Sequence, residues 1–407
     1  MTYENAKEMM TALGQEHIFK YWDELTEAER KALLGQIECT DFSVLSRTEH
    51  AADEGRGVFS PLAAMQRDEI EAREKELHDA GIKTIKAGKT AALLLAGGMG
   101  TRLGSDDPKG MFDIGLTKPV YIFERVIGNL LDVVRETDTW IRLFIMTSEK
   151  NHEATVAFLK EKNFFGYRED RVVFFKQDMA PACGFDGKLL LEAKNRISTS
   201  PNGNGGWYSS MVRAGLDKIL AEEGIEWIDI FAVDNVLQRI CDPCFVGATV
   251  LADVAVGAKV VRKAAPDEKV GVMCLEDGRP SIVEYYELSE EMMNAVDEKG
   301  EPAYNYGVIL NYLFRTSELP KVADDKMPLH IVRKKIPYIG GDGILVKPEE
   351  PNGFKFEQLV LDMIHQLPSC LPYEVIRERE FAPIKNATGI DSVESARELL
   401  KLNGIEL

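Results

Sequence analysis

Glycines and cations gather in one short segment near the end of the first quarter of the chain. Residues 96–104 read Ala-Gly-Gly-Met-Gly-Thr-Arg-Leu-Gly and directly follow the apolar run Ala91–Leu95. Glycine lets main-chain N–H groups come close to an anion, and successive N–H groups form a concave anion site. Arg102 and Lys109 add two cations to the same segment. This combination predicts a polyphosphate site at the carboxyl end of a first strand.

Two common phosphate-binding loops differ from this segment in their spacing. The dinucleotide fingerprint needs G-x-G-x-x-G, whereas three residues separate Gly100 from Gly104 here. The Walker A loop needs G-x-x-x-x-G-K-[ST], but Lys83 occupies the position of its first glycine before Gly88-Lys89-Thr90. The spacing therefore disfavours an NAD(P)-dependent oxidoreductase. A glycine-rich turn without a ligand is the structural alternative, which the two following cations disfavour.

From Thr90 onward, short apolar runs alternate with amphipathic stretches. The runs are Ala91–Leu95, Arg142–Met146, Val172–Phe175, Ile228–Val233, Ala258–Val261, Val270–Cys274, Ile282–Tyr286, Val308–Phe314 and Tyr373–Ile376, and the expected helices between them are Val126–Val134, Glu153–Lys162 and Ser209–Glu223. Strands separated by helices predict an α/β sheet that is largely parallel at its start. The closer spacing of the later runs favours a mixed or antiparallel extension.

The flanking regions differ from this central pattern. Residues 1–88 are highly charged and are expected to be helical, and Thr26-Glu-Ala-Glu29 fits a capping box. Residues 391–407 are expected to form one short helix with Asp391 as its N-cap. We therefore expect a helical N-terminal region at 1–88, a main domain at 89–390 and a short C-terminal helix at 391–407.

Composition excludes some classes of partner. The chain has 407 residues, 67 acidic against 49 basic side chains and a formal net charge of −18. This balance argues against general binding to nucleic acid or to an anionic membrane. The six cysteines are dispersed, and one C-x-x-C pair, Cys241 and Cys244, is weak evidence for a metal. Without a signal peptide or a long apolar stretch, a cytoplasmic protein is expected.

Further short motifs accompany the glycine loop along nearly the whole chain. They are Pro108–Leu116, Phe174–Ala182, Phe185–Lys188, Pro201–Gly206, Val233–Asn235, Val270–Val272, Val283–Tyr285, Lys335–Tyr338, Lys347–Pro348, Pro351–Lys355 and Glu380–Asn386. With the loop they resemble, in order and composition, the signature of eukaryotic-type UDP-sugar pyrophosphorylases. The UDP-N-acetylhexosamine pyrophosphorylase branch of that family is the most similar.

The resemblance implies a fold and an activity. The implied fold is a Rossmann-like, GT-A-like nucleotidyltransferase fold, in which helices flank a mixed α/β sheet and a helical region precedes it. The implied reaction joins UTP and a sugar 1-phosphate to give a UDP-sugar and pyrophosphate, with Mg²⁺ as cofactor. GlcNAc-1-phosphate is the first candidate, and glucose-1-phosphate, galactose-1-phosphate or a broad range of sugars are alternatives. A non-catalytic UDP-sugar sensor is a more distant one.

The resemblance also implies roles for individual residues. The catalytic cations are Arg102, Lys109 and Lys385. The nucleotide-binding residues are Gly97, Gly98, Gly100, Thr101, Gln177, Gly203, Asp234 and Lys355. The sugar-binding residues are Asn204, Gly271, Glu284, Tyr285 and Asn305.

Physical chemistry supports two of these roles directly. The carboxamide of Gln177 suits the uracil edge because it has both a donor and an acceptor. Asp234 ends an apolar strand, where a carboxylate can hold Mg²⁺ beside phosphates. Structural roles remain the alternatives: a strand-end amide at 177, a capping carboxylate at 234, a solvent-facing strand residue at 284, and surface lysines at 355 and 385.

Three features depart from the pattern of the family branch. Val308 stands where the branch has a further asparagine that contacts the sugar, and Asn305 or Asn311 would have to compensate. Leu359 and Leu361 stand where it has aromatic residues that pack on the acetyl group, although both could simply pack in a helix core. The chain also stops where animal members continue into a small β domain, which favours a monomer.

Overall fold

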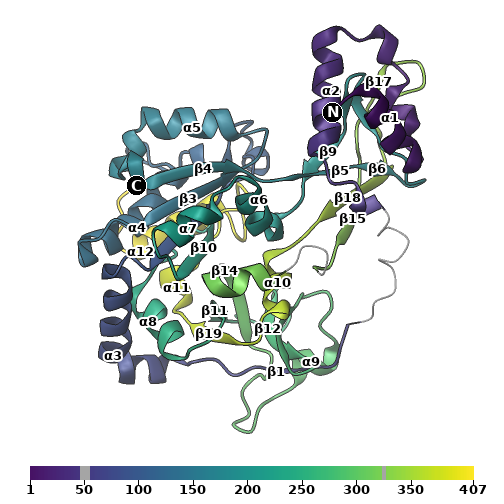
Figure 1. Cartoon of the computed structure of the whole chain (residues 1–407). Helices are drawn as coiled ribbons and strands as arrows, with labels where there is room; N and C mark the ends of the chain where they lie inside the picture. The colour runs from purple at the N-terminus through teal and green to yellow at the C-terminus, as the bar shows by residue number, and fades with distance from the viewer. Residues whose placement is uncertain (46–55, 323–326) are drawn as a thin grey trace. The chain divides into compact units, whose positions relative to one another are not determined.

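The computed structural model describes residues 1–45, 56–322 and 327–407, and Figure 1 traces these residues from purple to yellow. The chain forms two compact units, each assembled from three separate segments. The small unit contains residues 1–55, 178–206 and 327–360, of which 46–55 lie outside the described residues. The large unit contains residues 56–177, 207–326 and 361–407. Residues 1–88 thus contribute to both units.

The large unit is built on a mixed sheet. Its main strand order is β1-β12-β14-β10-β2-β3-β4, with β11, β13 and β19 paired to strands of this row or to one another. Its strands are β1 (Phe59–Pro61), β2 (Thr90–Leu95), β3 (Arg142–Thr147), β4 (Val172–Lys176), β10 (Trp227–Ala232), β11 (Val256–Arg262), β12 (Val272–Glu276), β13 (Arg279–Val283), β14 (Tyr306–Arg315) and β19 (Cys370–Glu374). The pairs β10–β2, β2–β3 and β3–β4 are parallel, whereas β14 runs antiparallel to β10, β11 and β12. The predicted fold class, a mixed α/β sheet flanked by helices, is confirmed.

Helices accompany this sheet in the large unit. They are α3 (Arg67–Lys86), α4 (Ile122–Thr137), α5 (His152–Glu161), α6 (Trp207–Arg213), α7 (Asp217–Glu222), α8 (Pro243–Leu251), α9 (Glu290–Asn294), α10 (Val360–Gln366, whose first residue belongs to the small unit), α11 (Arg377–Glu380) and α12 (Val393–Leu402). Helices α3 and α8 lie side by side in Figure 1, and glycines allow this approach. A Cβ at Gly81 would lie 1.8 Å from the Pro243 carbonyl oxygen, and one at Gly247 would lie 1.8 Å from that of Leu77.

The parallel strands place several loops along one edge of the sheet. Leu95 of β2 is level with Ala232 of β10 and with Met146 of β3, and Thr147 is level with Lys176 of β4. All six residues of β2 are buried, as a strand covered on both faces requires. Because the carboxyl ends coincide, the segments that follow each strand meet at this edge, where α/β proteins bind ligands.

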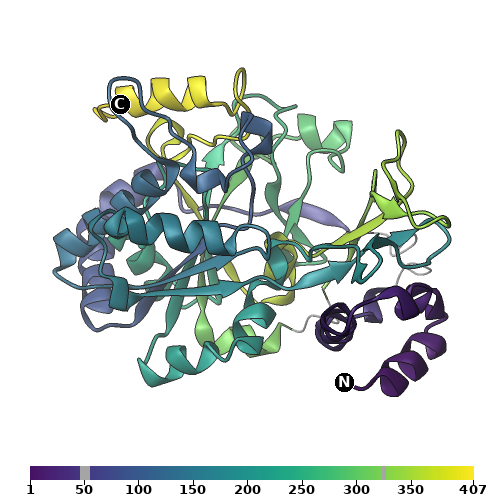
Figure 2. The ribbon, with the colours of Figure 1, turned by 90° about the horizontal axis from the view of Figure 1, so that it is seen from above.

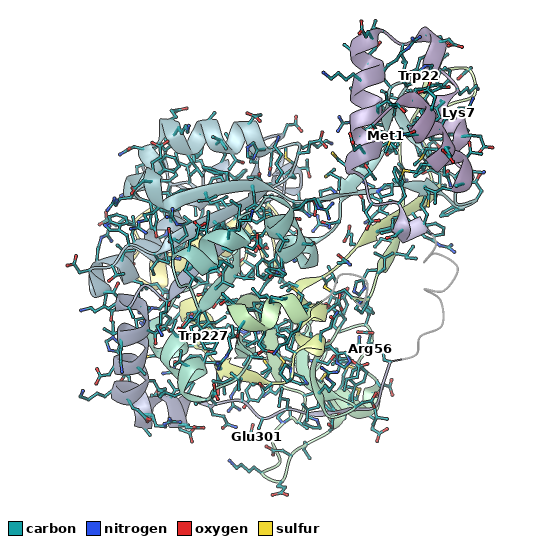
Figure 3. The ribbon with its side chains drawn as sticks, viewed as in Figure 1. Met1, Lys7, Trp22, Arg56, Trp227 and Glu301 are labelled. Carbon is teal, nitrogen blue, oxygen red and sulfur yellow. The ribbon has the colours of Figure 1, made fainter. Side chains whose placement is uncertain are left out.

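The small unit combines two helices with short strands. They are α1 (Tyr3–Ala12), α2 (Glu27–Cys39), β5 (Met179–Pro181), β6 (Cys183–Gly184), β7 (Leu191–Ala193), β8 (Arg196–Ile197), β9 (Thr199–Pro201), β15 (His330–Lys334), β16 (Tyr338–Ile339), β17 (Leu345–Val346) and β18 (Gly353–Glu357). Trp22, labelled in Figure 3, stacks on Tyr3 with ring centroids 4.3 Å apart and contacts the edge of Phe19. The predicted capping box at the start of α2 is present, since Thr26 and Glu29 each accept the other's main-chain N–H.

Two local predictions are wrong. Asp391 has a φ of 53° and does not cap the last helix; Ser392 does so, and its hydroxyl accepts from the Ser395 N–H. The expected helix Ser209–Glu223 is interrupted between α6 and α7, where Gly215 has a φ of 71°. Helix α12, the yellow helix near the C-terminus in Figure 2, is tied to the main chain at residues 114–115, whose carbonyls accept from the Arg397 guanidinium at 2.9 and 3.0 Å.

The structure also bears on two broader features of the chain. The thiol of Cys241 and that of Cys244 are free, and burial raises the pKa of Cys244 to about 12, so neither is set up as a reactive thiolate. Within the described residues, no helix combines the length and the apolar composition that crossing a bilayer requires.

Candidate active site

The glycine loop folds back on itself after β2. The Ala96 N–H donates to the Met146 carbonyl at 2.8 Å, which extends the sheet pairing by one residue. The Gly100 N–H donates to the Asp107 carbonyl at 2.8 Å, and the Lys109 N–H donates to the Gly98 carbonyl at 3.1 Å. The loop therefore brings Lys109 back beside the glycines. A Cβ at Gly98 would meet no atom of the described residues within 4 Å, so this backbone faces open space.

Gln177 lies against this loop. It directly follows β4, is 7% exposed, and its N–H donates to the Thr147 carbonyl at 2.8 Å. A Cβ at Gly97 would lie 2.6 Å from Gln177 Oε1, so a larger residue there would have to displace the Gln177 side chain. The structure thus brings together a predicted base-reading amide and the predicted nucleotide loop, although more than 70 residues separate them in the sequence.

A buried asparagine that the sequence analysis did not select supports the same loop. Asn151 is fully buried at the start of α5, and its Nδ2 donates to the carbonyls of Ala96 at 2.8 Å and Gly98 at 3.3 Å. Its Oδ1 accepts from the Ser148 N–H at 2.8 Å. The side chain ties the segment after β3 to the loop after β2. A single loop asparagine has no periodic signal, which is why the sequence did not reveal it.

The predicted cations and the predicted carboxylate share one electrostatic environment. Burial lowers the pKa of the Lys109 ammonium; the Asp234 carboxylate opposes this shift, and the positive charges of Arg102 and Lys385 add to it. Lys109 is half-buried, whereas Arg102 and Thr101 are exposed at the 3-10 helix Thr101–Leu103. Three cations and one carboxylate around a glycine loop form a site suited to a polyphosphate and its counterion.

Lys385 reaches this group from the C-terminal part of the chain. The Ile384 N–H donates to the Asp234 carbonyl at 2.9 Å, which places Lys385 one residue beyond the contact. The Lys385 ammonium lies 3.0 Å from the Asp391 carboxylate. The Lys385 main-chain N–H donates to the Asp391 carbonyl at 2.7 Å. The ammonium is 45% exposed, so it remains accessible to a ligand.

A second group of predicted residues lies together at another part of the large unit. A Cβ at Gly271 would lie 3.6 Å from the Glu284 carboxyl carbon and 3.5 Å from Val308 Cγ2, and the Val308 N–H donates to the Gly271 carbonyl at 2.9 Å. Glu284 follows β13 rather than lying within a strand, and its N–H donates to Glu287 Oε2 at 2.9 Å. Val308, the residue that departs from the family pattern, therefore lies beside Gly271 and close to Glu284.

The other predicted sugar-binding residues of the large unit have different partners. Tyr285 is 41% exposed and its ring packs on that of Tyr286. Asn305 is nearly buried, and its Oδ1 accepts from the Lys263 N–H at 3.2 Å.

Asn311 is engaged inside the sheet. Its Nδ2 donates to Asp229 Oδ1 at 3.0 Å, and both residues are fully buried. Its Oδ1 has no hydrogen-bond partner among the described residues. Burial raises the pKa of Asp229 to about 7, although the Cys241 N–H, Lys259 and Asn311 oppose the shift. Asn311 is therefore held by Asp229 and does not take over the role expected at position 308.

Three predicted residues belong to the small unit. A Cβ at Gly203, where φ is 93°, would lie 2.1 Å from the Gln358 carbonyl oxygen. Asn204 Oδ1 accepts from the Val360 N–H at 2.9 Å, so this loop lies directly beside Leu359. Lys355 is half-buried in β18 opposite Val332 of β15. Within this unit, the predicted loop at 203–204 and one of the two departing leucines are thus neighbours, while Leu361 begins the next segment of the large unit.

Comparisons with known proteins agree with these observations. The family profile described as UTP–glucose-1-phosphate uridylyltransferase matches residues 51–403. The UDP-N-acetylhexosamine pyrophosphorylase-like protein 1 of Homo sapiens is 37% identical over 95% of this chain and 82% of its own length. The UDP-N-acetylglucosamine pyrophosphorylase of Saccharomyces cerevisiae is 33% identical over 97% of this chain and 88% of its own length.

A solved structure extends the similarity to the fold. The uridine diphosphate N-acetylglucosamine pyrophosphorylase of Trypanosoma brucei, solved in complex with an inhibitor, matches with a TM-score of 0.80 at 27% identity. The match covers 98% of this chain and 84% of that chain. The resemblance is confirmed: the chain belongs to the family of the UTP–glucose-1-phosphate uridylyltransferases.

Proposed function

We propose that the protein joins UTP and a sugar 1-phosphate to give a UDP-sugar and pyrophosphate, with GlcNAc-1-phosphate as the first candidate substrate. The observation that carries this proposal is the grouping of Arg102, Lys109, Lys385 and Asp234 around the glycine loop. The names of the similar human, yeast and trypanosomal proteins support N-acetylhexosamine as the sugar. The contact of Val308 with the Gly271 group favours glucose-1-phosphate as the alternative, because an apolar side chain offers no hydrogen bond there.

The reaction needs positioning and charge neutralisation more than proton transfer. A phosphate oxygen of the sugar 1-phosphate attacks the α-phosphorus of UTP and forms a new P–O bond. The bond between the α-phosphorus and the bridging oxygen of the β-phosphate breaks, and its electron pair leaves on pyrophosphate. The attacking oxygen is already an anion, so no general base is required.

The residues of the large unit suit this sequence of charges. In our proposal Arg102 and Lys109 neutralise the leaving pyrophosphate, and Lys385 neutralises the phosphates that react. Gly97, Gly98, Gly100 and Thr101 offer main-chain contacts to the nucleotide, and Gln177 reads the uracil edge. Glu284 accepts hydrogen bonds from sugar hydroxyls beside Gly271, with Tyr285 and Asn305 as further sugar residues.

Three of the proposed residues belong to the small unit and are assigned separately. Gly203 and Lys355 are assigned to the nucleotide and Asn204 to the sugar. Their assignment rests on the family motif and on the ordered loop that Asn204 forms with Val360.

Magnesium is part of the proposal, with Asp234 as its protein ligand. Among the described residues, no group of three or more His, Cys, Asp or Glu side chains could hold a metal. This donor set does not suit a closed protein cage, but it suits Mg²⁺, which commonly takes one or two carboxylates together with substrate phosphates and water. The ion would supply charge neutralisation between the phosphates. Asp234 is half-buried beside Lys109, where a carboxylate can serve such an ion.

One assay tests the activity and the substrate together. Purified protein is incubated with UTP, Mg²⁺ and a panel of sugar 1-phosphates, and pyrophosphate release is measured. We expect release with GlcNAc-1-phosphate and its loss on chelation of the metal. No release with any sugar would leave the UDP-sugar sensor as the better explanation. Release with glucose-1-phosphate alone would overturn the first candidate substrate and keep the reaction class.

A further inference from the structure

The segment that carries Lys385 is held against the segment that carries Asp234. The Ile384 N–H donates to the Asp234 carbonyl at 2.9 Å, and the Val236 N–H donates to the Ala382 carbonyl at 3.3 Å. Asn235 and Pro383 face each other as an isolated antiparallel bridge between these two hydrogen bonds. Residues distant in sequence thus form a short ladder that ends at two proposed site residues.

The side chain of Asn235 bridges the same two segments. It is 1% exposed, so it has no access to bulk water. Its Nδ2 donates to the Glu380 carbonyl at 2.7 Å, and its Oδ1 accepts from the Ala382 N–H at 2.9 Å. An amide is the side chain that can both donate and accept at this point. Two of the three groups that Asn235 pairs are main-chain groups of the segment leading to Lys385, and the third is the Leu237 N–H of its own segment, 3.4 Å from Oδ1.

A buried ion pair fixes the far end of this segment. Lys259 is fully buried in β11, and its Nζ donates to Glu380 Oε2 at 2.5 Å and to the Arg239 carbonyl at 2.8 Å. Glu380 is therefore anchored by its carboxylate and by its carbonyl. With Glu380 fixed at one end, the bond between Asn235 and Ala382 and the bond between Ile384 and Asp234 together guide the chain up to Lys385.

We propose that Asn235 is a positioning residue that sets the separation between Asp234 and the Lys385 ammonium during nucleotidyl transfer. This inference rests on the proposed function, because it needs Lys385 to act on the reacting phosphates. Asn235 itself touches no substrate in this proposal. It acts through the main chain of residues 380–384, and its loss displaces Lys385 without removing it.

A double-mutant cycle tests this dependence. We expect Asn235→Ala to lower kcat by about 100-fold, the loss that a misplacement of about 1 Å can produce, with the KM for UTP changed less than about threefold. We expect Lys385→Ala to lower kcat as well, and the double variant to be no slower than Lys385→Ala alone. A purely structural role for Asn235 would instead give additive losses. Additive losses, or a near-normal kcat in either single variant, would overturn the inference.

Asn129 offers a matched control. Its Nδ2 donates to the carbonyls of Val236 at 3.1 Å and Gln238 at 3.0 Å, so it also holds the segment after β10. Its hydrogen bonds within the described residues are to Arg125, Val236 and Gln238, and so to neither end of the segment 380–385. We expect Asn129→Ala to lower the melting temperature as Asn235→Ala does and to leave kcat within about threefold. An equal loss of kcat in both variants would mean that general loosening of this segment, and not placement of Lys385, explains the effect.

A second measurement does not depend on activity. Asn235→Asp keeps the side-chain volume and the acceptor for Ala382 but removes the donor to Glu380, so it also serves if the alanine variant does not fold. We expect amide hydrogen exchange at Ile384, whose N–H donates to the Asp234 carbonyl, to become about tenfold faster, as the loss of one buried hydrogen bond predicts, while Ala382 keeps its acceptor. Unchanged exchange would overturn the inference even in an active enzyme. Wild-type protein that releases no pyrophosphate would instead overturn the proposed function, and the exchange result would still report on the anchor.

Discussion

Two corners of the large unit are built on different principles. The polyphosphate corner (Gly97–Gly100, Arg102, Lys109, Asp234 and Lys385) follows the parallel strands β2 and β10, and main-chain hydrogen bonds close its loops. The sugar corner (Gly271, Glu284 and Val308) lies among the antiparallel strands β12, β13 and β14 and is lined by side chains. A single substitution can therefore change the lining of the sugar corner without changing its backbone. In the proposed function the first corner serves the reaction common to all sugars, and the second corner selects the sugar.

The two corners also differ in what holds them. A buried network of Asn235, Lys259 and Glu380 anchors the polyphosphate corner. The sugar corner is held by Arg56, labelled in Figure 3, whose half-exposed guanidinium lies 2.9 Å from Glu287, and Glu287 in turn accepts from the Glu284 N–H. Hydrogen bonds from Arg56, the Gly57 N–H and Ser281 outweigh burial and lower the pKa of Glu276 to about 2. The support of the sugar corner is therefore more accessible to solvent and to salt than that of the polyphosphate corner.

The largest effect is expected in the polyphosphate corner. Arg102→Ala and Lys109→Ala should each remove about 2.7–4 kcal/mol of transition-state stabilisation, the scale of losing one preorganised donor. The loss should appear in kcat for every sugar 1-phosphate, because the leaving group is common to all. Steady-state pyrophosphate release measures it. A loss confined to one sugar would break the distinction between the corners.

Glu284→Gln should act on the sugar corner alone. The amide keeps the size of the side chain but replaces a charged acceptor. The resulting fall in kcat/KM for the sugar 1-phosphate should correspond to a loss of about 1.5–3 kcal/mol of binding free energy. The KM for UTP should stay within about twofold, and initial rates with each substrate varied in turn separate the two. Glu290→Gln, on the exposed start of α9, is the control for charge removal nearby. An equal rise in both KM values would mean that Glu284 does not report on the sugar.

Val308→Asn should change selectivity more than rate. A new amide beside Gly271 and Glu284 can pair a sugar substituent, and one hydrogen bond contributes about 0.5–1.5 kcal/mol. We expect the ratio of kcat/KM for GlcNAc-1-phosphate over glucose-1-phosphate to rise by up to about tenfold. Val308→Thr, which has nearly the same shape, controls for packing. If the asparagine variant keeps the wild-type ratio, residue 308 lies outside the selectivity-determining surface.

The smallest effect on activity is expected from Asp229, which lies in neither corner. Between its ordinary pKa of 3.8 and its raised value of about 7, the folded protein holds a proton that the unfolded chain has released. Stability therefore falls as pH rises through this window, and Asp229→Asn abolishes that term. The free energy of unfolding of the variant, relative to that of the wild type, should therefore be higher near pH 8 than near pH 4. The difference should be at least about 1.4 kcal/mol, the equivalent of one pKa unit. Urea unfolding measures this difference, and an equal gain at both pH values would contradict it.

Much of the fold could be predicted because its signals are local. The apolar runs correspond to strands β2, β3, β4, β10, β11, β12, β13, β14 and β19, since buried strands need continuous hydrophobic sequence. The capping box at Thr26 was predictable for the same reason. Asp391 does not cap the last helix because its backbone is left-handed. Its contacts with Lys385 accompany this conformation, which composition does not encode.

The candidate site residues could be selected from the sequence, but the way in which they assemble could not. The glycines and cations form a motif that can be recognised in the sequence. Asn151 and Asn235 are isolated loop amides, and their bonds to distant segments become visible only in the folded chain. The small unit likewise joins three segments that have no local signal for their union. Glu284 was expected in a strand, and the turn that ends β13 at Val283 depends on a hydrogen bond to Glu287.

The anchoring of Glu380 on Lys259 has a consequence for folding while the chain is synthesised on the ribosome. Strand β11, with its buried lysine, leaves the exit tunnel long before residue 380 has been translated. Until then, closing the sheet would enclose the ammonium without Glu380, its partner at 2.5 Å, and with Asp242 at 3.7 Å as the nearest remaining carboxylate, which is less favourable. Full stability of the central sheet therefore depends on the last part of the chain, and such long-range pairing slows folding. The same late segment thereby supplies Lys385, the proposed catalytic lysine, and the carboxylate that completes the buried ion pair.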